Sequence, residues 1–143
     1  MNTEDQSGWT FIETLIVISI IMILTGTVGF TALGYVDKAK AVSAKTQIAN
    51  LSMALDTYFM DTMQYPSEEQ GIEALWVKPV MEPVPEKWEG PYLQKQVLKD
   101  PWNNDYEYTV PGPNGLPYGI RSLGKDGLPG GEAAASDISS WER

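Results

Sequence analysis

The hydrophobic pattern of the chain changes at about residue 36. From Trp9 to Val36 the sequence is apolar on every side, and its one formal charge is Glu13. A helix that crosses a bilayer needs roughly 20 mostly apolar residues, so the pattern predicts a transmembrane helix over residues 9–36. Beyond it, apolar side chains recur every three or four positions, which predicts that the helix continues as an amphipathic helix to about Asp61. The predicted stripe is Ala41, Ala44, Ile48, Leu51, Leu55 and Tyr58.

A short helix and a long loop are expected next. Pro66 ends the preceding segment, Ser67 is a good helix N-cap, and Gln70 lies three residues further on, as in a capping box. These signals predict a short helix from about Glu68 to Val77. Prolines then interrupt residues 79–101, which predicts an ordered loop.

Alternating apolar and polar positions follow in two short segments. Residues 106–110 and 118–121 flank the turn sequence PGPNGLP, and this arrangement predicts a β-hairpin. Two strands alone are marginally stable, so the hairpin is expected to pack on the helix. The predicted fold is α+β: a long N-terminal helix packed against a short helix, loops and a small antiparallel hairpin or sheet.

Composition limits the possible functions. The 143 residues suffice for one anchor and one small domain, residues 37–143. A net charge of −9 argues against nucleic acid as a partner and suits a divalent cation. The chain contains neither cysteine nor histidine, which excludes disulfides, thiolate metal sites and the commonest general base. We therefore expect no enzymatic activity; a signal-anchored periplasmic enzyme, the alternative, would need another catalytic group.

Glu13 is unusual because it lies inside the apolar segment. A carboxylate there costs about 2.5–3.5 kcal/mol on insertion scales, so it requires a partner. No lysine or arginine precedes Lys38, so the cation available at this end is an α-amine. Cleavage between Gly8 and Trp9 would create one. An ordinary signal anchor, with Glu13 near the lipid headgroups, is the alternative.

The segment GWTFIETLIVISI resembles the processing site of type IV pilins and type II secretion pseudopilins. The resemblance implies that a prepilin peptidase removes the leader, residues 1–8, and methylates Trp9. It also implies that Glu13 meets the terminal amine of a neighbouring subunit during assembly. Two features differ from the family pattern: the leader MNTEDQSG has no basic residue, and the first mature residue is Trp9 where phenylalanine is common.

Two further segments resemble the major pseudopilin of type II secretion. YPSEEQGIEALWVKP is similar to the family run YPTTEQGLEALVxKP, and DPWNNDYEY to DPWGNDYxY. The resemblance implies a structural subunit that polymerises into a periplasmic helical filament and drives export of folded proteins across the outer membrane. Its implied partners are further copies, minor pseudopilins, an inner-membrane assembly platform and prepilin peptidase. A type IV pilin of a surface pilus is the alternative.

The resemblance also implies a location. It places the chain in the inner membrane as a single-pass protein, with residues 37–143 in the periplasm. The positive-inside rule alone predicts the reverse, because Lys38, Lys40 and Lys45 follow the apolar segment. We follow the resemblance, since the processing motif is more specific than three lysines.

The C-terminal segment SLGKDGLPGGEAAASDISSW has no apolar period. Taken alone, such a segment is most often a solvated loop. Calcium could hold it, since calcium accepts six to eight carboxylate and carbonyl oxygens in irregular loops. The segment resembles the calcium loop of major pseudopilins, and EAAAS departs from the more polar family insert. The resemblance implies ligation by the Asp126 and Asp137 carboxylates and the carbonyls of Leu123 and Leu128, with Glu132 and Ser139 as further candidates.

Overall fold

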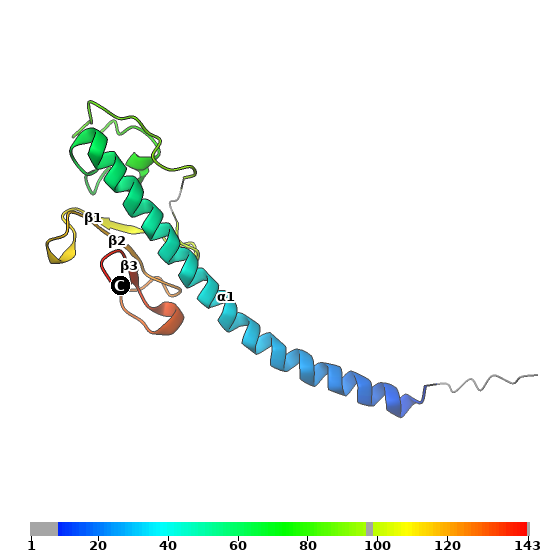
Figure 1. Cartoon of the computed structure of the whole chain (residues 1–143). Helices are drawn as coiled ribbons and strands as arrows, with labels where there is room; N and C mark the ends of the chain where they lie inside the picture. The colour runs from blue at the N-terminus through cyan, green and yellow to red at the C-terminus, as the bar shows by residue number, and fades with distance from the viewer. Residues whose placement is uncertain (1–8, 97–98, 143) are drawn as a thin grey trace, which may run out of the picture. The chain divides into compact units, whose positions relative to one another are not determined.

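The computed structural model describes residues 9–96 and 99–142, apart from the side chains of residues 27–33 and 134. One α-helix and three strands form the framework: α1 (Phe11–Thr62), β1 (Glu107–Thr109), β2 (Gly119–Ser122) and β3 (Ile138–Ser139) (Figure 1). Three short 3-10 helices complete it: η1 (Ile72–Leu75), η2 (Pro113–Gly115) and η3 (Ala133–Ala135). By its internal contacts the chain divides into two units, Met1–Val36 and Asp37–Arg143.

The first unit contains the N-terminal part of α1. The large apolar side chains from Phe11 to Leu24 are exposed there, and Phe11 itself is 81% exposed. The hydroxyls of Ser19 and Thr25 donate to the carbonyls of Leu15 and Ile21, one turn back, which satisfies these polar groups within the helix. Among the described residues, no helix reaches the combination of length and hydropathy needed for a bilayer span. The predicted transmembrane segment, residues 9–36, is therefore not confirmed.

The second unit contains the core. It is built from one face of α1, from η1 and from the strands, which lie beside α1 in Figure 1. The predicted stripe of α1 is confirmed: Ala41 is half-buried, and its other members are buried. The buried apolar residues are Ala44, Ile48, Leu51, Ala54, Leu55, Tyr58, Ile72, Ala74, Leu75, Tyr106, Ile120 and Ile138. Fully burying one leucine contributes roughly 1.5–3 kcal/mol to folding, so this stripe fixes which side of α1 faces the strands.

The predicted short helix from Glu68 to Val77 is wrong in extent and type. The capping box itself forms: the Gln70 N–H donates to Ser67 Oγ at 3.2 Å, and the Ser67 N–H donates to Gln70 Oε1 at 3.0 Å. Gly71 then adopts a φ of 59°, in the left-handed region, so the turn cannot continue as an α-helix. A single 3-10 turn, η1, follows instead.

The predicted hairpin is confirmed, and it has a third strand. β1 pairs antiparallel with β2, with Glu107 opposite Arg121 and Tyr108 opposite Ile120. β2 also pairs antiparallel with β3, with Arg121 opposite Ser139. The strand order is therefore β1-β2-β3, and the C-terminal segment is part of the sheet.

Tyrosines join the sheet and its flanking segments to α1 and to the segment after it. Tyr118 donates its hydroxyl toward Ser52 O and Asp56 Oδ1, and Tyr108 donates to Pro66 O. Burial raises the pKa of Tyr108 and Tyr106 strongly, and burial is also the main reason that the pKa of Tyr118 rises to about 12. These hydroxyls must stay protonated for the folded state to keep its contacts.

Alkaline pH is expected to destabilise this unit. A tyrosine that ionises near pH 10 when unfolded and near 12 when folded contributes stability that is full below pH 10 and is lost as the pH rises toward 12. The free energy of unfolding, measured with denaturant at several pH values, should therefore fall across this window. Tyr118→Phe should make the fall shallower, and an unchanged slope in that variant would contradict the assignment.

Candidate functional site

The N-terminal candidates lie at the start of α1. Gly8 lies outside the described residues, and Trp9 is 69% exposed. The Glu13 N–H donates to Thr10 Oγ1 at 3.3 Å, so Thr10 caps the helix and Glu13 lies in its first turn, where a negative charge is favoured. The Glu13 side chain is exposed, and none of the ion pairs among the described residues involves it. The arrangement leaves its carboxylate available to another molecule.

The C-terminal candidates lie in the loop between β2 and β3, residues 123–137. Gly124 has a φ of 65°, and a Cβ there would lie 2.8 Å from the carbonyl oxygen of Ser136. Only glycine allows this close approach of the two ends of the loop. Lys125 adds an ion pair with Asp37 of α1 at 2.8 Å. The loop is thus anchored at its start, although it contains few apolar side chains.

The base of this loop rests on a buried acid, Asp100, which entered the sequence analysis only as part of the family-like segment DPWNNDYEY. Asp100 is 5% exposed and accepts hydrogen bonds from the Trp102 and Asn104 N–H groups and, at 2.6 Å, from Ser122 Oγ. Asn104 Nδ2 in turn donates to Gly124 O at 2.7 Å. The DPWNN turn therefore holds the point where β2 enters the loop. The polar run of the DPWNN segment was the one sequence signal for this role. It does not reveal the partner of Asp100, because Ser122 is 22 residues away in the sequence.

The two predicted carboxylate ligands are held differently. Asp126 is exposed, and its Oδ1 accepts the Leu128 N–H at 3.1 Å, within the turn that also presents the Leu128 carbonyl. The Asp137 side chain is only 17% exposed, and its Oδ2 accepts from the Gly130 N–H at 3.1 Å and from Arg121 Nη1 at 3.3 Å. Asp126 thus bonds the backbone two residues further on, whereas Asp137 bonds the backbone at the middle of the loop.

The other oxygen of Asp137 is the feature that bears most directly on metal binding. Asp137 Oδ1 is buried and has no hydrogen-bond partner among the residues that the structure describes. A buried acceptor without a partner costs roughly 1–3 kcal/mol, and more when it is charged, so this oxygen fits a ligand to a cation. The described residues contain no group of three or more acidic, histidine or cysteine side chains placed to hold a metal. A cation here would therefore need further oxygen ligands, such as backbone carbonyls.

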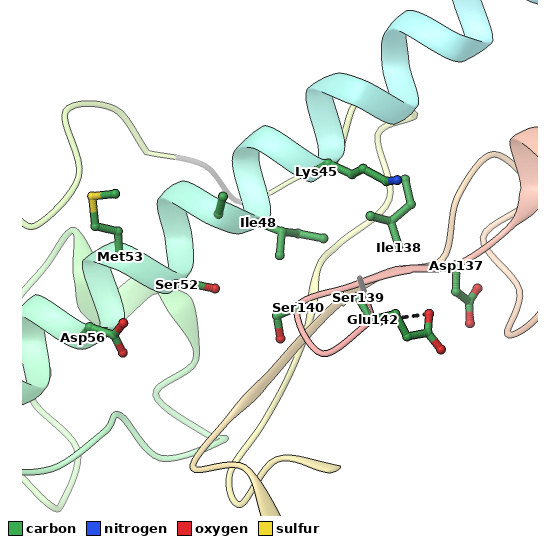
Figure 2. Close-up of a pocket in the computed structure, with 11 residues that line it drawn as sticks. Lys45, Ile48, Ser52, Met53, Asp56, Asp137, Ile138, Ser139, Ser140 and Glu142 are labelled. Carbon is green, nitrogen blue, oxygen red and sulfur yellow. Dashed lines mark hydrogen bonds between the residues drawn. The ribbon is translucent and has the colours of Figure 1, made fainter. Parts of the chain in front are cut away.

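The remaining candidates lie nearby. Glu132 is exposed at the start of η3, and Ser139 Oγ in β3 donates to Glu142 Oε2 at 3.1 Å. A groove of about 770 Å³ runs between α1 and the C-terminal segment. Figure 2 shows its lining, with the Asp137 side chain pointing away from α1. Its lining residues are Lys45, Ile48, Ala49, Ser52, Met53, Asp56, Asp137, Ile138, Ser139, Ser140 and Glu142.

Comparisons with known proteins agree on one family. A family model described as "Type II secretion system (T2SS), protein G" matches residues 31–141. The Type II secretion system core protein G of Pseudomonas aeruginosa is 40% identical to this chain over 142 residues. The match covers 99% of this chain and 99% of the relative. The core protein G of Vibrio cholerae is 42% identical over 137 residues, covering 95% of this chain and 92% of the relative.

A solved structure is similar in fold as well. The crystal structure of the major pseudopilin from the type 2 secretion system of enterohaemorrhagic Escherichia coli has a TM-score of 0.64 and 34% identity to this chain. The match covers 76% of this chain and 92% of that protein.

Proposed function

The chain belongs to the protein G family of the type II secretion system, and we propose that it polymerises into a periplasmic filament that drives folded proteins across the outer membrane. It is a structural subunit of the pseudopilus; the observation that carries this is the family match over residues 31–141. The family is one of structural proteins and not of known enzymes. The alternative of a surface pilin has less support, since the relatives carry the type II secretion name.

Assembly is proposed to need further copies of the chain, minor pseudopilins and an inner-membrane assembly platform. One repeated contact that does not close on itself would generate the filament. Family membership indicates association with a secretion apparatus of the cell envelope. Residues 9–36 are proposed to anchor the subunit in the inner membrane before assembly, with residues 37–143 in the periplasm. Support comes from the many exposed apolar side chains of α1 from Phe11 to Leu24, among which Glu13 is the one formal charge.

Prepilin peptidase is proposed to cut after Gly8 and to methylate Trp9. We expect the full chain to restore release of type II exoproteins in a strain deleted for its gene, and Gly8→Leu to fail because a bulky residue at the cleavage site blocks processing. Mass spectrometry should find residues 1–8 in the Gly8→Leu protein and not in the wild type. Ser7→Ala is the matched control and should be processed. A wild-type protein that keeps its leader in the presence of the peptidase would contradict the processing proposal; normal release from the deleted strain would contradict the function.

Calcium is proposed to bind the loop between β2 and β3. The candidate ligands are the carboxylates of Asp126 and Asp137 and the carbonyls of Leu123 and Leu128. The support is the buried, unpartnered Oδ1 of Asp137 and the scarcity of apolar side chains in the loop. A bound calcium would supply positive charge and join oxygens from distant points of the loop. Asp137 would contribute a fixed oxygen, since its other oxygen is already held, whereas Asp126 is exposed and would have to order on binding.

A further inference from the structure

Three charged side chains form a row across one face of the sheet. Arg121 of β2 lies opposite Glu107 of β1 and opposite Ser139 of β3, and Asp137 lies two residues before Ser139. Successive side chains of a strand point to opposite faces. Ile120 is fully buried on the core face, so Arg121 points to the other face, together with Glu107 and Asp137.

The Arg121 guanidinium joins both acids. Its Nε and Nη2 donate to Glu107 Oε2 at 2.8 and 2.6 Å, and its Nη1 donates to Asp137 Oδ2 at 3.3 Å. The Arg121 side chain is 30% exposed and that of Glu107 is 42% exposed, so water screens the first pair partly. Asp137 is the most buried member of the row. A planar guanidinium suits this arrangement because it donates along several fixed directions at once.

We propose that the positive charge of Arg121 regulates the proposed calcium site. It stabilises Asp137 when no metal is bound, and it lowers the affinity of the loop for calcium. This inference rests on the calcium proposal. Arg121 and the Gly130 N–H take Oδ2 of Asp137, so one oxygen, Oδ1, remains for a metal. The fixed positive charge also repels a divalent cation bound at Oδ1.

Removing Arg121 has two opposing effects on calcium affinity: it removes the charge repulsion, and it removes a contact that positions Asp137. The neighbouring contacts decide which of the two is larger. Without Arg121, Asp137 Oδ2 still accepts the Gly130 N–H at 3.1 Å, and the Asp137 N–H still donates to Gly130 O at 3.2 Å. The orientation of the carboxylate is therefore kept in large part, while its full negative charge becomes available. Loss of the repulsion should outweigh loss of the positioning contact.

The test compares calcium affinity and thermal stability in the full chain, purified in detergent. We expect Arg121→Gln to melt below the wild type in chelator and to bind calcium about tenfold more tightly by calorimetry, so that the difference in melting temperature between calcium and chelator widens. Glu107→Gln should have the opposite effect on affinity, because it leaves the guanidinium charge less neutralised. Lys99→Gln is the control: it breaks an exposed pair with Asp105 and should leave calcium affinity unchanged.

Each other outcome overturns the inference. Lower melting temperatures of Arg121→Gln with an unchanged calcium affinity would make Arg121 a structural contact. Weaker calcium binding by Arg121→Gln would make it an orienting residue. If Arg121→Gln does not fold, an unchanged or increased affinity of Glu107→Gln contradicts the proposal. A wild-type chain that does not bind calcium would refute the calcium site and this inference together, and would leave the family assignment untouched.

Discussion

Glu13→Ala is expected to abolish filament assembly while membrane insertion and leader removal proceed normally. The substitution removes a charge from an apolar segment, which makes insertion more favourable. The fold of the second unit should not change, because Glu13 lies outside it and none of the ion pairs among the described residues involves its side chain. The amine proposed as its partner has a pKa near 8 and is mostly cationic at neutral pH.

The experiment for Glu13 separates assembly from processing. Mature mass reports leader removal, and electron microscopy of cells that overproduce the chain reports filaments. Glu13→Asp keeps the charge and should assemble in part, whereas Thr14→Ala changes the adjacent residue without removing a charge and should assemble normally. Filaments of normal abundance from Glu13→Ala would show that the carboxylate is dispensable. Loss of processing in that variant would place its role before assembly.

The parts of the fold predicted from sequence are those encoded by local pattern. The stripe on α1 from Ala44 to Tyr58 follows from helical periodicity alone. The hairpin follows from alternation on both sides of a turn-rich segment. The helix expected at Glu68–Val77 failed because the capping signals at Ser67 and Gln70 predict where a helix begins but not how far it extends; Gly71 adopts a positive φ that ends the turn. The strand β3 was not predicted, because two residues carry no readable alternation and its existence depends on pairing with β2.

In the candidate site, too, local sequence predicts some residues, whereas others depend on the tertiary fold. Asp126 and Asp137 could be proposed because a motif places them, and that assignment remains a proposal. Arg121 could not be found in this way, because its role depends on the register that sets it opposite Glu107 and diagonal to Asp137. Likewise, the role of Asp100 could not be predicted, because it depends on the hydrogen bond that Ser122 of β2 donates to it. Contacts between residues far apart in the sequence follow from the tertiary fold, which local patterns do not encode.

Calcium is expected to raise the melting temperature of the full chain, and Asp126→Ala to remove most of that increase. A ligand that binds only the folded state adds about 2.7 kcal/mol of stability at 100 times its dissociation constant. For a folded unit of this size, 1 kcal/mol shifts the melting temperature by about 4–8 °C, so the expected shift is on the order of 10 °C. Magnesium should substitute poorly, because it requires a tighter octahedral shell than an irregular loop provides.

Asp126 is the better residue for this test because it separates metal binding from folding. Its exposed carboxylate accepts a hydrogen bond from the Leu128 N–H, and such a bond contributes little to the stability of the fold. Asp126→Ala should therefore melt close to the wild type in chelator. Asp137→Ala would also break the contacts with Arg121 and Gly130 and would lower stability with or without metal. Asp105→Ala, at another exposed acid, is the control and should keep the calcium response. Equal melting temperatures of the wild type in calcium and in chelator would favour the solvated loop, since nothing in that alternative responds to the cation.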